Sequence, residues 1–254
     1  MKKILVIKLG ALGDVVRTLS VLPAIKNKYP DSEIYWVTKP NALSLFENNK
    51  YVKKAFTIPY ISDKNEKFDI LYNFDIEEEA SNIAKSTQAN EKLGFYSEEG
   101  FGQVFNLEAE YYLNTMFDDY LKKTNKKTYQ QMMFEAAKLE WKNQTPEIFL
   151  TSKEREYAEN FASKNKLKGK KVIGIHMGAG PRWPSKAWHN DNLKEFVVKA
   201  KAEGYEIILF GGPEEIEKQG KLIKELDKSN IKVLQNNPNN TIREFAALVS
   251  LCDV

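Results

Sequence analysis

The sequence predicts an α/β protein with doubly wound, mostly parallel sheets. Short apolar runs, such as residues 4–7 and 205–210, have the length and composition of buried strands. After the first run, a glycine turn leads to apolar residues at helical spacing: Val15, Leu19, Leu22 and Ile25. Because strands that alternate with helices pair in parallel, we expect helices on both faces of each sheet.

The elements of the first half follow from these patterns and from turn residues. Glu77, Glu78 and Glu79 suit the positive end of a helix dipole and mark a helix start. We expect strands at residues 4–7, 33–37, 52–58 and 68–74, and helices at 14–28, 41–48 and from 77 onward. Between residues 94 and 141 the rhythm becomes irregular and aromatic residues accumulate, which indicates core packing or a groove for sugar rings.

The second half repeats the strand-then-helix order, so we predict two domains, residues 1–150 and 151–254. Ser152 is the expected cap of a helix that reaches Lys164. Further strands are expected at 171–175, 205–210 and 231–234, and helices at 190–203, after 215 and at 241–250. Residues 251–254 resemble the opening of one more strand, so we expect the second sheet to be incomplete here.

Composition narrows the class of protein. The 254 residues are 42% hydrophobic, which suffices for a sizeable core, and no apolar run approaches the roughly 20 residues that span a bilayer. The single Cys252 excludes an internal disulfide, and with only His176 and His189 beside it we expect no metal site and a cytoplasmic protein.

The net charge is only +3, but lysines cluster in two segments. They indicate solvated faces or, alternatively, attraction to an anionic membrane surface or a phosphorylated acceptor. Nucleic acid is not expected, because the basic residues are not interleaved with aromatics on a recognisable module. The clusters are Lys122, Lys123, Lys126 and Lys127, and Lys164, Lys166, Lys168, Lys170 and Lys171.

Candidate ligand positions lie where the expected strands end. Gly10 and Gly13 form a turn after the first strand, and Asp14 stands at the start of the following helix. Backbone N–H groups point outward at such a corner, so Asp14 is either a helix cap or a ligand-facing carboxylate. The strands of the second half end in further glycines that allow a ligand to approach the backbone closely: Gly178, Gly180, Gly211 and Gly212.

Four segments, in order, resemble glycosyltransferase family 9, the ADP-heptose:lipopolysaccharide heptosyltransferases. They are residues 4–14 (ILVIKLGALGD), residues 173–188 with His176-Met-Gly-Ala-Gly180 and Arg182-Trp-Pro-Ser-Lys186, residues 209–215 (LFGGPEE), and residues 241–254. The resemblance implies a GT-B architecture, in which two Rossmann-like domains face each other across a cleft. It places the acceptor mainly on residues 1–150 and the nucleotide sugar mainly on residues 151–254.

The resemblance also implies roles for single residues. Asp14 is the expected general base of an inverting transfer, and Arg182 with Lys186 is expected to neutralise the departing diphosphate in place of a metal. Pro181 stands where the family has a phosphate-binding lysine, which transfers that role to Arg182. Glu215 is either a ribose ligand or a helix starter, and Asn240 lies near the expected adenine. The donor-side residues are therefore Gly13, Gly178, Arg182, Lys186, Glu215 and Asn240.

The function implied is cofactor-free transfer of a heptose-like sugar from ADP-heptose to a lipid-linked lipopolysaccharide core acceptor, at the inner face of the cytoplasmic membrane. Two alternatives stay open. One is the same fold acting with another nucleotide sugar on a different surface glycan. The other is a non-catalytic module that binds a nucleotide or a glycan.

Overall fold

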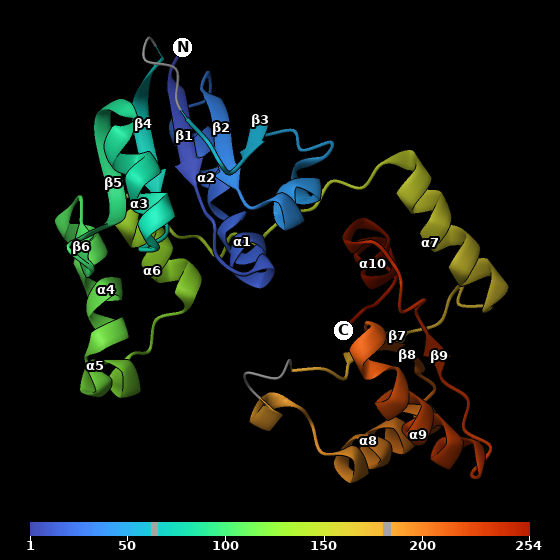
Figure 1. Ribbon diagram of the computed structural model, residues 1–254. Coiled ribbons are helices and arrows are strands. Elements are labelled where there is room, and N and C mark those ends of the chain that lie inside the picture. The colour runs from blue at the N-terminus through green and yellow to red at the C-terminus, as the bar shows by residue number, and fades with distance from the viewer. Residues whose placement is uncertain (62–65, 180–183) are drawn as a thin grey trace. The chain divides into compact units, whose positions relative to one another are not determined.

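The computed structural model describes residues 1–61, 66–179 and 184–254. The chain divides into two compact units, unit 1 (Met1–Phe149) and unit 2 (Leu150–Val254) (Figure 1). Within the described residues, no helix is long and apolar enough to cross a membrane.

Unit 1 contains a six-stranded sheet in the order β3-β2-β1-β4-β5-β6. All neighbouring strands pair in parallel except β5 and β6, which form an antiparallel hairpin. The sheet therefore confirms the expected α/β class. Its strands are β1 (Lys3–Ile7), β2 (Glu33–Thr38), β3 (Val52–Thr57), β4 (Lys67–Asn73), β5 (Gln88–Glu98) and β6 (Phe101–Val104).

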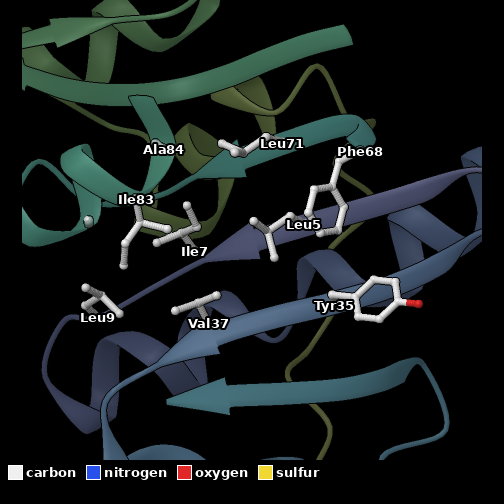
Figure 2. Packing of buried hydrophobic residues seen from close by; sticks show 10 residues of the cluster. Leu5, Ile7, Leu9, Tyr35, Val37, Phe68, Leu71, Ile83 and Ala84 are labelled. Carbon is white, nitrogen blue, oxygen red and sulfur yellow. The ribbon is translucent and has the colours of Figure 1, made fainter. Parts of the chain in front are cut away.

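The core of unit 1 follows from the alternation of side chains along β1. Leu5 and Ile7 point to the face covered by α3 (Glu78–Ser86), where they pack near Ile83 (Figure 2). Ile4 and Val6 point to the opposite face and are also completely buried. Because both faces of β1 are covered, its sequence is a continuous apolar run.

The helix expected at residues 14–28 is instead two helices, α1 (Leu12–Thr18) and α2 (Val21–Lys28). Pro23 explains the break, because it has no N–H and its ring would collide with the Leu19 carbonyl in a continuous helix. The helix expected at 41–48 is a 3₁₀ helix, η1 (Pro40–Phe46).

The aromatic segment is more regular than the sequence indicates. After the hairpin come η2 (Leu107–Ala109), α4 (Glu110–Phe117), α5 (Asp119–Thr124) and α6 (Tyr129–Ala136). Its aromatic rings pack on one another, as with Phe95 and Tyr112, whose centroids are 5.3 Å apart. Strand β5 was not predicted, because much of its first half is polar and exposed. Gly94 within it has φ +96°, and a Cβ there would lie 2.0 Å from the Asn73 carbonyl oxygen, so this position requires glycine.

Unit 2 contains a parallel three-stranded sheet, β7-β8-β9. Ile207 and Leu209 of β8 pack under α8 and α9, whereas Ile208 and Phe210 pack toward α7 and α10, so helices cover both faces. Its elements are α7 (Ser152–Lys164), β7 (Val172–His176), η3 (Pro184–Lys186), α8 (Asn190–Ala202), β8 (Glu206–Phe210), η4 (Pro213–Glu215), α9 (Ile216–Asp227), β9 (Leu234–Gln235) and α10 (Ile242–Val249).

The third strand of unit 2 is shorter than expected, whereas the strand opening expected at residues 251–254 pairs with β7. Strand β9 has only two residues, because Ile231 and Val233 pack against the α8–α9 side without pairing with β8. Beside β7, Val254 accepts a hydrogen bond from the Gly174 N–H (2.8 Å) and its own N–H donates to the Val172 carbonyl (3.4 Å). This is the bonding pattern of a parallel strand pair.

A buried ion pair joins α7 to α10. The cap of α7 is Thr151 rather than Ser152, and Thr151 forms a capping box with Glu154. The Glu154 carboxylate also accepts hydrogen bonds from Nε and Nη2 of Arg243 (2.7 and 2.6 Å), and the Arg243 side chain is only 6% exposed. Hydrogen bonding from Arg243 lowers the pKa of Glu154 from 4.5 to about 2, outweighing the burial that would raise it.

We expect Glu154→Gln to lower the free energy of unfolding of unit 2 by about 3 kcal/mol at pH 7, because the charge-assisted hydrogen bonds from Arg243 to the Glu154 carboxylate are weakened. The folded-state pKa is depressed, so this stabilisation is complete above the ordinary pKa of 4.5 and is lost as the pH falls toward about 2. Urea unfolding at pH 7 and pH 3 measures both effects.

The control is Glu159→Gln, which changes an exposed carboxylate on the same helix. It should leave the urea midpoint close to that of the parent protein. A Glu154→Gln protein that keeps the parental stability at pH 7 would contradict the role of the pair.

Candidate functional site

The ligand edge of unit 1 lies where β1 and β4 end. From β1 the chain builds the sheet through β2 to β3 on one side, and from β4 through β5 to β6 on the other. The two neighbouring strands therefore form a topological switch point. In open α/β sheets, ligands bind outside the carboxyl ends of the strands at such a point.

A buried ion pair between Lys8 and Asp75 joins the ends of β1 and β4 at this edge. The Lys8 ammonium, directly after β1, donates to Asp75 Oδ1 (2.7 Å) and to the Phe74 carbonyl (2.8 Å) after β4. Asp75 Oδ2 accepts the backbone N–H groups of Leu9 and Gly10. One carboxylate thus links the two strand ends and holds the first turn of the loop that leads to α1.

Lys8 remains charged in this buried position. Its side chain is 6% exposed, and burial by itself would lower the pKa of Lys8. Tyr129 and the hydrogen-bonded Asp75 outweigh burial and raise the pKa of Lys8 above its usual value. The sequence did not single out this pair; its signal is a charged residue at the end of each of two buried strands.

Asp14 lies on the outer side of the same corner. It is the third residue of α1, the cap residue is Ala11, and no side chain caps the helix, so the capping interpretation of Asp14 is wrong. Its carboxylate is 38% exposed and accepts a hydrogen bond from Nη2 of Arg17, one turn further along α1. The structure therefore places at this edge an exposed carboxylate with a cation beside it.

Two tyrosines lie beside Arg17, the partner of this carboxylate. The Tyr129 ring centroid lies 3.9 Å from the Arg17 guanidinium carbon, and the Tyr112 ring packs edge-on against Tyr129 at 5.7 Å. Burial is the main cause that raises the pKa of Tyr112 to about 12. The first turn of α1 is open at Gly13, where a Cβ would meet no atom of the described residues within 4 Å.

The ligand edge of unit 2 is built around Glu215, the last residue of η4. Glu215 Oε2 accepts the Gly212 N–H (2.8 Å), and a Cβ on Gly178 would lie 2.2 Å from Glu215 Oε1. The end of β7 and the turn after β8 therefore meet at this carboxylate. Glu215 starts the helix as one interpretation expects, since it closes a capping box on Gly212 and is the N-cap of α9, and its carboxylate also lies against the loop after β7.

Asn236 organises the adjacent turn and was not predicted. Its Oδ1 accepts the Gly211 N–H (3.0 Å), and its Nδ2 donates to the Gly211 carbonyl (3.1 Å) and to Asn240 Oδ1 (3.3 Å). Asn240 in turn donates to the Tyr157 hydroxyl (2.6 Å). The structure thus connects Asn240 to the turn after β8. The sequence signal for Asn236 is an amide residue directly after a short strand.

The remaining candidates lie in the loop after β7. Lys186 is exposed on η3, and Arg182 lies outside the described residues. His176 accepts the Gly178 N–H at Nδ1 (3.1 Å) and so shapes the loop, while Trp188 packs on Phe196 with centroids 5.1 Å apart. In the part of the chain that the structure describes, no three His, Cys, Asp or Glu residues gather as a candidate metal centre.

Solved structures with a similar fold confirm the expected GT-B fold class. A glycosyl transferase family 9 protein from Veillonella parvula is 19% identical with a TM-score of 0.76, covering 100% of this chain and 74% of that one. The E. coli ADP-heptose LPS heptosyltransferase II is 18% identical with a TM-score of 0.64, covering 98% and 77%. E. coli heptosyltransferase WaaC with ADP-2-deoxy-2-fluoro heptose is 12% identical with a TM-score of 0.62, covering 98% and 80%.

The sequence identifies the family more specifically. The model of glycosyltransferase family 9 (heptosyltransferase) matches residues 64–254, so the chain belongs to this family. The lipopolysaccharide core heptosyltransferase OpsX of Haemophilus influenzae is 27% identical over 107 residues. That alignment spans 37% of this chain and 30% of OpsX.

We expect Asp75→Asn to lower the free energy of unfolding by about 3–5 kcal/mol, because Lys8 is left as a buried charge. The double variant Lys8→Met/Asp75→Asn should recover part of this loss, since the amide oxygen still accepts a backbone N–H and no charge stays buried. Urea unfolding of both proteins measures the difference.

The control is Glu77→Gln, which breaks the exposed pair with Lys39 and should cost less than about 1 kcal/mol. If Asp75→Asn costs no more than this control, the pair does not hold the strand ends.

Proposed function

We propose that this protein transfers a heptose-like sugar from ADP-heptose to a lipopolysaccharide core acceptor, with inversion at the anomeric carbon and without a metal ion. The family match over residues 64–254 carries the proposal. The relative OpsX is named a lipopolysaccharide core heptosyltransferase, and WaaC has been solved with an ADP-heptose analogue. The exposed Asp14 supplies the carboxylate that such a reaction requires.

In this proposal Asp14 is the general base. Its carboxylate accepts the proton of an acceptor hydroxyl while the hydroxyl oxygen forms a bond to the anomeric carbon. On the opposite side of that carbon, the bond to the terminal phosphate oxygen of ADP breaks, and ADP leaves with the electron pair. Attack opposite to the leaving group inverts the configuration.

The donor is assigned to the ligand edge of unit 2. We assign Glu215 to the ribose hydroxyls, since its carboxylate lies at the meeting point of the loops after β7 and β8. Lys186 and Arg182 are assigned to the diphosphate, whose developing charge they would stabilise in place of a metal. Gly178 keeps the backbone close to Glu215, Asn240 adjoins the assigned adenine position, and Gly13 is the donor-side residue of unit 1.

The proposed acceptor is lipid-linked, which places the reaction at the inner face of the cytoplasmic membrane. Peripheral association with anionic lipid is part of the proposal. Exposed lysines of α5 and the following loop, Lys122, Lys123 and Lys126, are the candidate contacts.

We expect Asp14→Asn to lower kcat by about 100-fold or more, which is the usual size of a general-base contribution. Stability and the KM for ADP-heptose should change little, because Asp14 does not cap α1 and the amide oxygen can still accept a bond from Arg17. The assay follows ADP release from ADP-heptose with lipopolysaccharide that lacks core heptose, with and without EDTA.

Asp31→Asn is the matched control, an exposed aspartate that precedes β2 at the other end of the sheet. Unchanged kcat of Asp14→Asn at saturating substrates would remove Asp14 as the base. Loss of parental activity with EDTA would contradict metal independence. ADP binding without any transfer by the parent protein would favour the non-catalytic alternative.

We expect Gly178→Ala to weaken ADP affinity by about tenfold or more while leaving the unfolding midpoint nearly unchanged. The new Cβ would lie 2.2 Å from Glu215 Oε1, and the flexible carboxylate end would move rather than the backbone. Isothermal calorimetry with ADP measures the effect. Gly220→Ala, in α9, serves as the glycine control, because a Cβ there would meet no atom of the described residues within 4 Å; parental ADP affinity in Gly178→Ala would contradict the assigned position of the donor.

A further inference from the structure

Asp14 is held by a side chain that the reaction described above does not use. Arg17 Nη2 donates to Asp14 Oδ1 on the outer face of α1. Both side chains are substantially exposed, 45% for Arg17 and 38% for Asp14. An exposed pair of this kind one helical turn apart stabilises a helix by only a few tenths of a kcal/mol. By itself it would hold the carboxylate loosely.

Tyr129, which is distant from Arg17 in the sequence, restricts the Arg17 side chain further. Its ring centroid lies 3.9 Å from the Arg17 guanidinium carbon, which is the range of a cation–π contact. The Tyr129 hydroxyl lies 3.1 Å from Thr18 Oγ1, whose proton is donated to the Asp14 carbonyl (2.7 Å). The Tyr129 side chain therefore contacts α1 at two points: its ring lies over Arg17 and its hydroxyl lies within hydrogen-bond distance of Thr18.

The tyrosine is itself fixed. It is the first residue of α6, directly after Thr128, which forms a capping box with Gln131. The Tyr112 ring packs edge-on against it at 5.7 Å, and Tyr112 packs in turn on the fully buried Phe95. A packed aromatic side chain thus presents its ring to the guanidinium of Arg17.

We propose that Arg17, stacked on Tyr129, is a positioning residue that orients the Asp14 carboxylate for proton abstraction. A planar guanidinium held against a ring has little rotational freedom, so its bond to Oδ1 fixes the plane of the carboxylate and directs Oδ2 toward the acceptor hydroxyl. The inference rests on the proposed role of Asp14 as base. Arg17 and Tyr129 act through Asp14 and do not themselves take the proton.

The first test is Arg17→Gln, assayed with ADP-heptose and lipopolysaccharide that lacks core heptose. We expect kcat to fall by at least about tenfold, because small displacements of a reacting group have large effects on rate, while the KM for ADP-heptose stays within about twofold. Tyr129→Leu should lower kcat similarly, and Tyr129→Phe, which keeps the ring, should retain several times more activity than Tyr129→Leu. Lys199→Gln breaks a comparable exposed helical pair with Glu195 in unit 2 and should leave kcat unchanged.

The second test separates positioning from a general structural effect. If Arg17 acts only through the carboxylate, Arg17→Gln should cause no further loss in an Asp14→Asn background. Added guanidinium ion should also restore part of the kcat of Arg17→Ala. Equal losses from Arg17→Gln in both backgrounds, or parental kcat in Arg17→Gln, would overturn the inference. Parental kcat in Asp14→Asn alone would instead refute the proposed base.

Discussion

The ion pair between Lys8 and Asp75 is the interaction on which the ligand edge of unit 1 depends. It joins the ends of β1 and β4, the two strands between which the direction of chain winding reverses. The second oxygen of Asp75 binds the N–H groups of Leu9 and Gly10, so the loop toward α1 starts in one defined direction. A buried charge is tolerated here because its partners replace the lost water. The position of Asp14 follows from this geometry.

The same interaction distinguishes the ligand edges of the two units. In unit 1 an internal carboxylate occupies the first backbone N–H groups after β1, the groups that bind phosphate in many nucleotide-binding turns. This supports the proposal that unit 1 handles the acceptor and its proton. In unit 2, Gly178 brings the backbone against Glu215, and Asn236 bonds both backbone polar groups of Gly211. These contacts fix a glycine-containing turn whose backbone a ligand can approach closely, which supports the proposal that the nucleotide binds there.

The differences between the predicted and observed elements have local physical causes. Pro23 divides the first predicted helix because it removes one hydrogen bond and crowds another. Thr151 displaces Ser152 as the cap of α7, since Glu154 is three residues after Thr151 and completes the capping box. Strand β5 was not predicted because its polar first half has no strand pattern. Pairing with β4 nevertheless holds this segment in the sheet.

The sequence by itself determined the α/β class, the alternation of strands and helices, the family, and the location of Asp14, Gly178 and Glu215 at strand ends. These features depend on the local spacing of apolar residues and on the positions of glycines, and both can be recognised within a short stretch of sequence. Only the tertiary structure decided that Lys8 meets Asp75 and that Tyr129 stacks on Arg17, 112 positions earlier in the chain. Such contacts depend on strand order and on the docking of α6, which no local pattern specifies. The sequence thus locates the candidate carboxylate Asp14, and the fold determines which side chains contact it.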